Sequence, residues 1–168
     1  MSADAPVSYA REVLGGVEAE LEGLVQDYYD RTPAHEGLPP YRFQWPVYWQ
    51  AENAKSLLLV TARRDRKRWG GRSGAGHYTG TLAGWALYLV IGHPHHRGFT
   101  VAECDTLAVS PEERGKGIGR GLVEFATPLL RDMKATRIIH RHRLVYGDNA
   151  LFPKLGFQPV EVAYSKDI

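Results

Sequence analysis

The feature that most constrains this chain is a glycine-rich turn at residues 114–120, between a predicted strand and a predicted helix. Residues 101–109 have the apolar content of a strand, and residues 121–130 that of a helix. Glycines let a backbone approach a ligand closely, and the first N–H groups of a helix favour anions. The turn also carries three basic side chains, those of Arg114, Lys116 and Arg120. We therefore predict a phosphate-binding turn, with a glycine-rich turn bearing solvated charges as the alternative.

The spacing of the glycines excludes two common phosphate-binding motifs. A Walker A loop needs Gly-Lys followed by Ser or Thr, and the sequence contains no such tripeptide. A dinucleotide-binding loop needs G-x-G-x-x-G, but Arg120 and Leu122 stand where its third glycine would be. The pattern that is present is R-x-x-G-x-G, formed by Arg114, Gly117 and Gly119.

This pattern resembles the pyrophosphate loop of the GNAT superfamily of acetyl-coenzyme A-dependent N-acyltransferases. TLAVSPEERGKGIGRGLVEFA is similar to that family's strand, loop and helix, and NALFPKLGFQPV is similar to its last helix and strand. The resemblance covers roughly residue 56 to the C-terminus. An aromatic-rich segment, a VTAR strand end and the pattern D-x-L-x-V-x-P-E-x-R-G also resemble small acetyltransferases encoded by bacteriophages.

The resemblance implies a coenzyme site and a fold. Acetyl-coenzyme A, as co-substrate, would lie in a gap between the two strands on either side of the glycine loop. Backbone N–H groups of the first of these strands would bond the thioester and the pantetheine arm. The residues implied to bind the coenzyme are Leu107, Ala108, Val109, Arg114, Gly115, Lys116, Gly117, Ile118, Gly119, Arg120, Asn149 and Phe152.

Direct acyl transfer needs a general base close to the amine. Glu103 and Asp105 are expected to alternate onto one face of their strand, together with Leu107 and Val109. The resemblance makes Glu103 the first candidate for the base and Asp105 the second. A buried, uncharged environment would raise the pKa of either carboxyl group and improve it as a base. Solvated strand residues without a catalytic role are the alternative.

The leaving thiolate lacks its usual proton donor. Many family members carry Tyr four residues before the glycine of the Gly-Phe pair, and this chain has Phe152 there. Tyr146 is the nearest phenol in the sequence and could be the general acid. Water or unassisted departure could serve instead, with Tyr146 as a surface or packing residue.

The histidines and the cysteine do not predict a metal site. His93, His95 and His96 form one cluster, and His140 and His142 would share a strand face, but nothing in the spacing requires a metal. His140 or His142 could relay a proton in the coenzyme gap, with a structural role as the alternative. Cys104 is the only cysteine, which excludes an intramolecular disulfide framework and a multi-cysteine zinc site.

A basic segment raises the question of nucleic acid. Residues 63–72 contain six positive side chains, one negative side chain and Trp69, a combination that could track phosphates and stack a base. It belongs to a glycine-rich insertion expected over residues 63–78. A solvated hairpin tip is the alternative. The formal net charge of +2 is too small to favour nucleic-acid binding over this alternative.

The chain is predicted to form one domain, residues 1–168, of the mixed α/β class, with helices on the faces of the sheet. Residues 1–54 would form a helical, aromatic-rich segment on the substrate side. The expected elements are a helix over 7–30, a short helix beginning near Pro46, strands over 56–62, 81–91 and 101–109, a helix to about 133, a strand over 137–144, a short helix over 149–155 and a strand over 157–165. This order lacks the family's usual first and last strands, and an exposed edge could be covered in a homodimer, so we expect a monomer or a homodimer.

These observations predict an N-acetyltransferase that moves an acetyl group from acetyl-coenzyme A directly to a primary amine. The acceptor is a small molecule or a macromolecule. We expect a cytoplasmic protein without a membrane span. A non-catalytic module that binds coenzyme A or nucleic acid is the alternative, and an enzyme on this fold that modifies a nucleobase is another.

Overall fold

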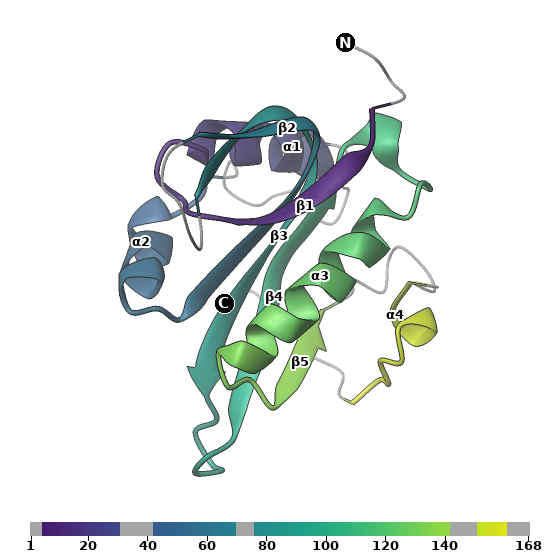
Figure 1. Cartoon of the computed structure of the whole chain (residues 1–168). Helices are drawn as coiled ribbons and strands as arrows, with labels where there is room; N and C mark the ends of the chain where they lie inside the picture. Colours follow the sequence, from purple (N-terminus) through teal and green to yellow (C-terminus); the bar gives the residue numbers. More distant parts are fainter. Residues whose placement is uncertain (1–4, 31–41, 70–75, 142–150, 161–168) are drawn as a thin grey trace.

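The computed structural model describes residues 5–30, 42–69, 76–141 and 151–160, and it contains a five-stranded mixed sheet flanked by helices (Figure 1). The strands lie in the order β1-β2-β3-β4-β5, antiparallel except for the parallel pair β4 and β5. Their bounds are β1 Val7–Glu12, β2 Leu57–Trp69, β3 His77–Gly92, β4 Thr100–Val109 and β5 Arg137–His140. The predicted mixed α/β class is thereby confirmed.

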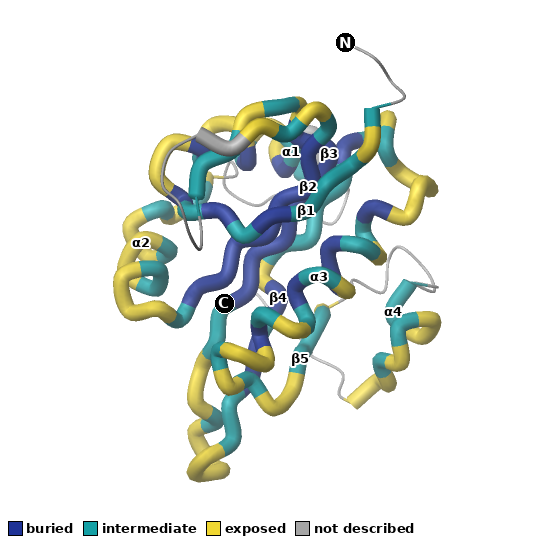
Figure 2. The backbone as a smooth tube through the Cα atoms, viewed as in Figure 1, coloured by how far each residue is buried: buried dark blue, intermediate teal, exposed yellow. Residues whose placement is uncertain are grey.

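The helices divide between the two faces of this sheet (Figure 1). Apolar residues of α1 and α2 pack with Leu57 and Leu59 on one face, and those of α3 pack with Leu58 and Val60 on the other. Because both faces are covered there, the central parts of the sheet, residues 57–63 of β2 and 82–88 of β3, are buried (Figure 2). The helices are α1 Glu18–Asp30, α2 Trp45–Asn53, α3 Ile118–Asp132 and α4 Leu151–Lys154, and a short 3₁₀ helix covers Pro111–Glu113. None of the described helices is long and apolar enough to cross a membrane.

The first part of the predicted N-terminal helix is wrong, because the chain begins with a strand. β1 pairs antiparallel with β2, from Val7 opposite Arg64 to Glu12 opposite Leu59. The family's first strand, which the sequence did not reveal, is therefore present. Gly16 adopts a positive φ of 94° and separates this strand from α1. Apolar residues on both sides of that break share helical spacing by coincidence, which concealed the short strand.

The segment predicted as a basic insertion is largely part of the sheet, which corrects that expectation. β2 continues to Trp69 and β3 begins at His77, so the predicted strand over 56–62 was too short. The Arg63 side chain is 1% exposed, and its guanidinium contacts the carboxylates of Glu12 and Glu20. These two carboxylates neutralise the guanidinium charge, so Arg63 can be buried inside the protein.

Two further cations of this segment have internal partners. Arg64 forms a bidentate pair with Glu113, and Arg66 donates to the Tyr9 carbonyl and lies over the Tyr78 ring. These contacts leave less positive charge available to phosphates than the sequence suggests.

The C-terminal elements agree in part with expectation. α3 and β5 begin and end close to the predicted bounds as far as His140, and the short helix α4 falls within the predicted range 149–155. Residues 157–160 do not form a strand, which corrects the first part of the predicted final strand. Residues 142–144 and 161–165 lie outside the described part of the chain.

Candidate functional site

A β-bulge in β4 decides where the candidate catalytic side chains point. Cys104 lies opposite Tyr88 and Thr106 lies opposite Leu87, so Asp105 is an extra residue between two ladder pairs. Directly opposed residues of an antiparallel ladder share a face. The extra residue therefore reverses the alternation of side chains along the strand.

The bulge places Glu103 and Leu107 on opposite faces, which corrects the prediction of a common face. Glu103 lies opposite Leu89, which packs against the α1/α2 core. Leu107 lies opposite Ala86 in the α3 core, and Val109 packs against that core too. A regular alternation of side chains cannot anticipate an inserted residue.

Asp105 contacts α2 through a phenol. Tyr48 donates a hydrogen bond to Asp105 Oδ2 over 3.0 Å, and the Thr106 hydroxyl donates to the same oxygen over 3.0 Å. Burial, and secondarily the negative charge of Asp105, raise the pKa of the Tyr48 phenol, which keeps it a donor. The aromatic content of residues 41–54 was visible in the sequence, but this particular pairing was not.

Glu103 has a charged partner. Its Oε2 atom lies 2.8 Å from Arg141 Nη1, and its side chain is 28% exposed. The buried, uncharged environment considered for this carboxylate is therefore not what surrounds it.

The ladder between β4 and β5 covers four residue pairs in the part of the chain that the structure describes. Pairing runs from Val101 with Arg137 to Cys104 with His140. In the described part of the chain, residues 105–109 of β4 have no ladder partner on that side. The predicted binding of the coenzyme by Leu107, Ala108 and Val109 stays a prediction.

The glycine loop forms an open cradle at the start of α3. Gly115 and Gly117 adopt positive φ values of 78° and 81°, and Gly117 is the N-cap without a side-chain cap. The Gly121 N–H donates to the Gly117 carbonyl over 2.9 Å. A Cβ atom at either of the two positive-φ glycines would meet no atom within 4 Å, so the backbone faces open space. N–H groups at such a helix start fit a pyrophosphate.

The basic side chains of the loop have local partners. Arg114 Nε donates to the Val109 carbonyl over 3.2 Å, Lys116 lies 3.2 Å from Glu113, and Arg120 lies 2.7 Å from Glu124. All three basic residues are exposed at the loop, where their charge adds to that of the helix start.

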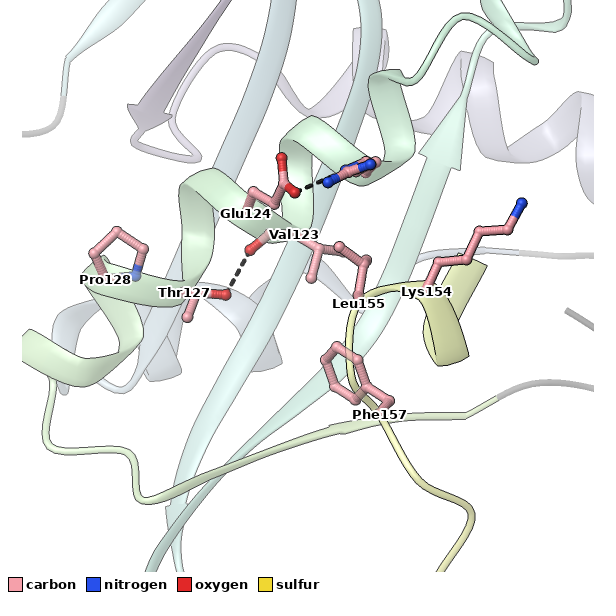
Figure 3. A pocket seen from close by; sticks show the side chains of 8 residues that line it. Val123, Glu124, Thr127, Pro128, Lys154, Leu155 and Phe157 are labelled. Carbon is pink, nitrogen blue, oxygen red and sulfur yellow. Dashed lines mark hydrogen bonds and ion pairs between the residues drawn. The ribbon is translucent and has the colours of Figure 1, made fainter. Parts of the chain in front are cut away.

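A cavity of about 370 Å³ lies between α3 and α4 (Figure 3). Arg120, at the end of the glycine loop, is one of its lining residues. Lys154 lines the side formed by α4 (Figure 3). The remaining lining residues are Val123, Glu124, Thr127, Pro128, Leu155 and Phe157. The cavity therefore lies along α3, from Arg120 to Pro128.

Phe152 lies in an aromatic group at the end of β5. Its ring centroid is 4.6 Å from that of His140 and 5.7 Å from that of Phe157. The hydroxyl of Tyr88 lies 3.4 Å from His140 Nε2. Tyr88 was missed by sequence reasoning, because nothing distinguishes it within an apolar strand.

The remaining candidates are dispersed or lie outside the described residues. Tyr146, Asn149 and His142 belong to the latter group. The histidines of residues 93–96 lie in the turn after β3, far along the chain from the glycine loop. Within the described ranges, no group of three or more His, Cys, Asp or Glu residues is arranged to hold a metal ion.

Comparison with known proteins assigns the family. A model of the acetyltransferase (GNAT) family matches residues 25–157. A comparison with curated protein sequences finds no match. The mixed sheet, the glycine loop and this match define the class: the chain belongs to the GNAT family of acetyltransferases.

Solved structures share the fold at low sequence identity. A ribosomal-protein-alanine N-acetyltransferase from Brucella melitensis biovar Abortus 2308 is 16% identical with a TM-score of 0.66, covering 97% of this chain and 99% of its own. Glucosamine-6-phosphate N-acetyltransferase from Arabidopsis thaliana is 12% identical and has a TM-score of 0.65. The match covers 96% of this chain and 98% of the plant enzyme's chain. A Trypanosoma brucei acetyltransferase is 17% identical and has a TM-score of 0.64. The match covers 97% of this chain and 100% of the Trypanosoma chain. At these identities the likeness concerns the fold alone.

Proposed function

We propose that this protein transfers the acetyl group of acetyl-coenzyme A directly to a primary amine. The observation that carries the proposal is that residues 105–109 of β4, which have no partner on the β5 side among the described residues, lead directly into the glycine cradle at the start of α3. A ligand with an anionic end and an extended, amide-bearing arm fits this site: its anionic end would lie in the glycine cradle and its arm along the strand. Bound there, acetyl-coenzyme A supplies an activated thioester.

Each part of the site has a proposed task. The N–H groups around Gly117 and Gly119 bind the pyrophosphate, with support from Arg114, Lys116 and Arg120. The backbone of β4 binds the arm and orients the thioester at the bulge. Asn149, Tyr146 and Phe152 keep the roles that the family resemblance implies for them, as predictions.

The carboxylates beside the bulge are proposed to accept the proton of the amine. Both partners of Asp105 are neutral hydroxyl donors, whereas Glu103 is paired with Arg141. An oxygen of Glu103 is thus engaged by a guanidinium and is less accessible to an incoming amine. These contacts favour Asp105 as the base, with Glu103 as the second candidate.

Neighbouring carboxylates on α1 suit a cationic acceptor. Trp45 Nε1 donates to Glu22 over 2.7 Å, and Trp49 Nε1 donates to Glu18 over 3.1 Å. Like Asp105, these acids are held by neutral aromatic donors, so their negative charge attracts an ammonium group. The acceptor is an amine of a small molecule or a macromolecule.

Other expectations stay predictions. They are the cytoplasmic location, the monomeric or homodimeric state and the likeness to bacteriophage-encoded acetyltransferases. A binding module without catalysis and a nucleobase-modifying enzyme are the competing functions. Turnover against a panel of amines distinguishes the enzyme from the binding module.

Calorimetry with coenzyme A tests the proposal. It compares two variants in which the substitution strains the backbone to the same extent. Gly117→Glu places bulk and negative charge in the cradle and should abolish binding. Gly98→Glu is its control, because Gly98 has the same φ of 81° and equally open space but lies in the exposed turn after β3. Unchanged affinity in folded Gly117→Glu protein would contradict the coenzyme assignment.

A further inference from the structure

Three polar residues form one row across β3, β4 and β5. Tyr88 lies opposite Cys104 in the antiparallel ladder, and Cys104 lies opposite His140 in the parallel ladder. Tyr88 and Cys104 are buried in the core beneath α3. The row therefore faces α3, on the opposite side of the sheet from the Glu103 carboxylate.

His140 is the member of the row that borders the coenzyme gap. In the described part of the chain, it belongs to the last pair of the β4/β5 ladder. Its ring packs against Phe152 and Phe157, with centroid distances of 4.6 Å and 5.1 Å. The imidazole thus lies beside Phe152, the position of the missing phenol, and pairs with the residue that precedes the proposed binding edge 105–109.

The imidazole is neutral and oriented. Burial lowers the pKa of His140 to about 4. The titratable groups that face it, Tyr88 and Cys104, are neutral too, because burial raises the pKa of the phenol and of the thiol. A neutral imidazole has one N–H donor and one acceptor nitrogen. The Tyr88 hydroxyl lies 3.4 Å from Nε2 and also contacts the Cys104 thiol. When the hydroxyl donates to Nε2, the imidazole proton is on Nδ1.

We propose that His140, held in this tautomer by Tyr88, donates an Nδ1–H hydrogen bond to the coenzyme sulfur and so replaces the phenol absent at Phe152. The inference rests on the proposed function. In the transfer, the amine nitrogen bonds to the acetyl carbon and loses its proton to the base carboxylate. The carbon–sulfur bond breaks and its electron pair stays on sulfur. His140 keeps its proton, and water later protonates the thiolate.

The thiol pKa of bound coenzyme A tests this role without any acceptor. The thiolate is titrated by its ultraviolet absorbance on the saturated protein, with the desulfo coenzyme as the blank. A hydrogen bond to the thiolate should lower the thiol pKa by about one unit, tenfold in the equilibrium, relative to free coenzyme. His140→Phe should remove this shift, and Tyr88→Phe should reduce it. His95→Phe, in the exposed turn after β3, should leave it unchanged.

Two further variants report on the tautomer and on folding. His140→Asn places an amide donor near the position of Nδ1 and should retain part of the shift, whereas His140→Gln places it near Nε2 and should not. An equal thiol pKa in wild-type and His140→Phe protein, both saturated with coenzyme, would overturn the inference while leaving the proposed function intact. Retention by His140→Gln but not by His140→Asn would overturn the Nδ1 assignment. Absence of coenzyme binding to the wild type would instead overturn the proposed function.

Discussion

The Tyr9 side chain occupies the space that any side chain at Gly121 would need. A Cβ atom on Gly121 would lie 2.9 Å from Tyr9 Cε1 and closer still to the hydroxyl. Tyr9 also stacks on Phe125, with ring centroids 6.0 Å apart. The first strand is thereby packed against the start of α3, where the glycine loop ends.

Gly121→Ala should destabilise the protein by about 1–3 kcal/mol, because the added methyl group overpacks this contact. Gly23→Ala is the matched control: it also lies in a helix, but its Cβ would meet nothing within 4 Å. That control should be neutral or stabilising by up to about 1 kcal/mol. Urea denaturation measures both, and equal effects would contradict the contact.

Arg63→Ala should destabilise the protein by about 3–5 kcal/mol, since it leaves the buried Glu12 carboxylate without its ion-pair partner. Lys67→Ala, on the same strand but exposed, should change stability by less than about 0.5 kcal/mol. Chemical denaturation at neutral pH compares the two. A small effect of Arg63→Ala would mean that Glu12 is solvated.

The pair between Arg64 and Glu113 should contribute to acid sensitivity. The Arg64 hydrogen bond, above all, lowers the pKa of Glu113 from 4.5 to about 2. A depressed carboxylate pKa stabilises the fold above the unfolded value and loses that contribution as the pH falls toward the folded value. Between about pH 5 and pH 2, wild-type protein should therefore lose more stability than Glu113→Gln. Parallel stability curves would contradict this.

Removal of the base should lower turnover without loss of coenzyme affinity. Asp105→Asn should reduce kcat by about 10²–10⁴-fold. Glu103→Gln should have the smaller effect, because its carboxylate is paired with Arg141. Thiol release with a responsive amine measures both. The reverse order would restore Glu103 as the base.

The basic segment should not support strong nucleic-acid binding. Arg63, Arg64 and Arg66 are engaged with partners inside the protein. Fluorescence anisotropy with DNA and RNA oligonucleotides at low salt should show no specific saturation. Binding that weakens steeply with salt and collapses on neutralising Arg66, Lys67 and Arg68 would contradict this expectation.

The sequence by itself determined the strand, glycine loop and helix that run through residues 100–132. Each is set by neighbours in the chain: apolar residues on a strand, glycines where φ is positive at Gly115 and Gly117, and helical spacing afterwards. Such patterns of nearby residues indicate the local backbone conformation. The class of fold and the conformation of the glycine loop could therefore be predicted from the sequence.

Only the tertiary structure decided which side chains meet. The bulge at Asp105 reversed the faces of β4, β1 became a strand by pairing with β2, and Arg63 became a core residue through Glu12 and Glu20. Tyr88 and His140 are neighbours through two ladders, although they are 52 residues apart in the chain. Strand register and ion pairing depend on partners distant in sequence, and a one-residue insertion moves every following side chain to the other face.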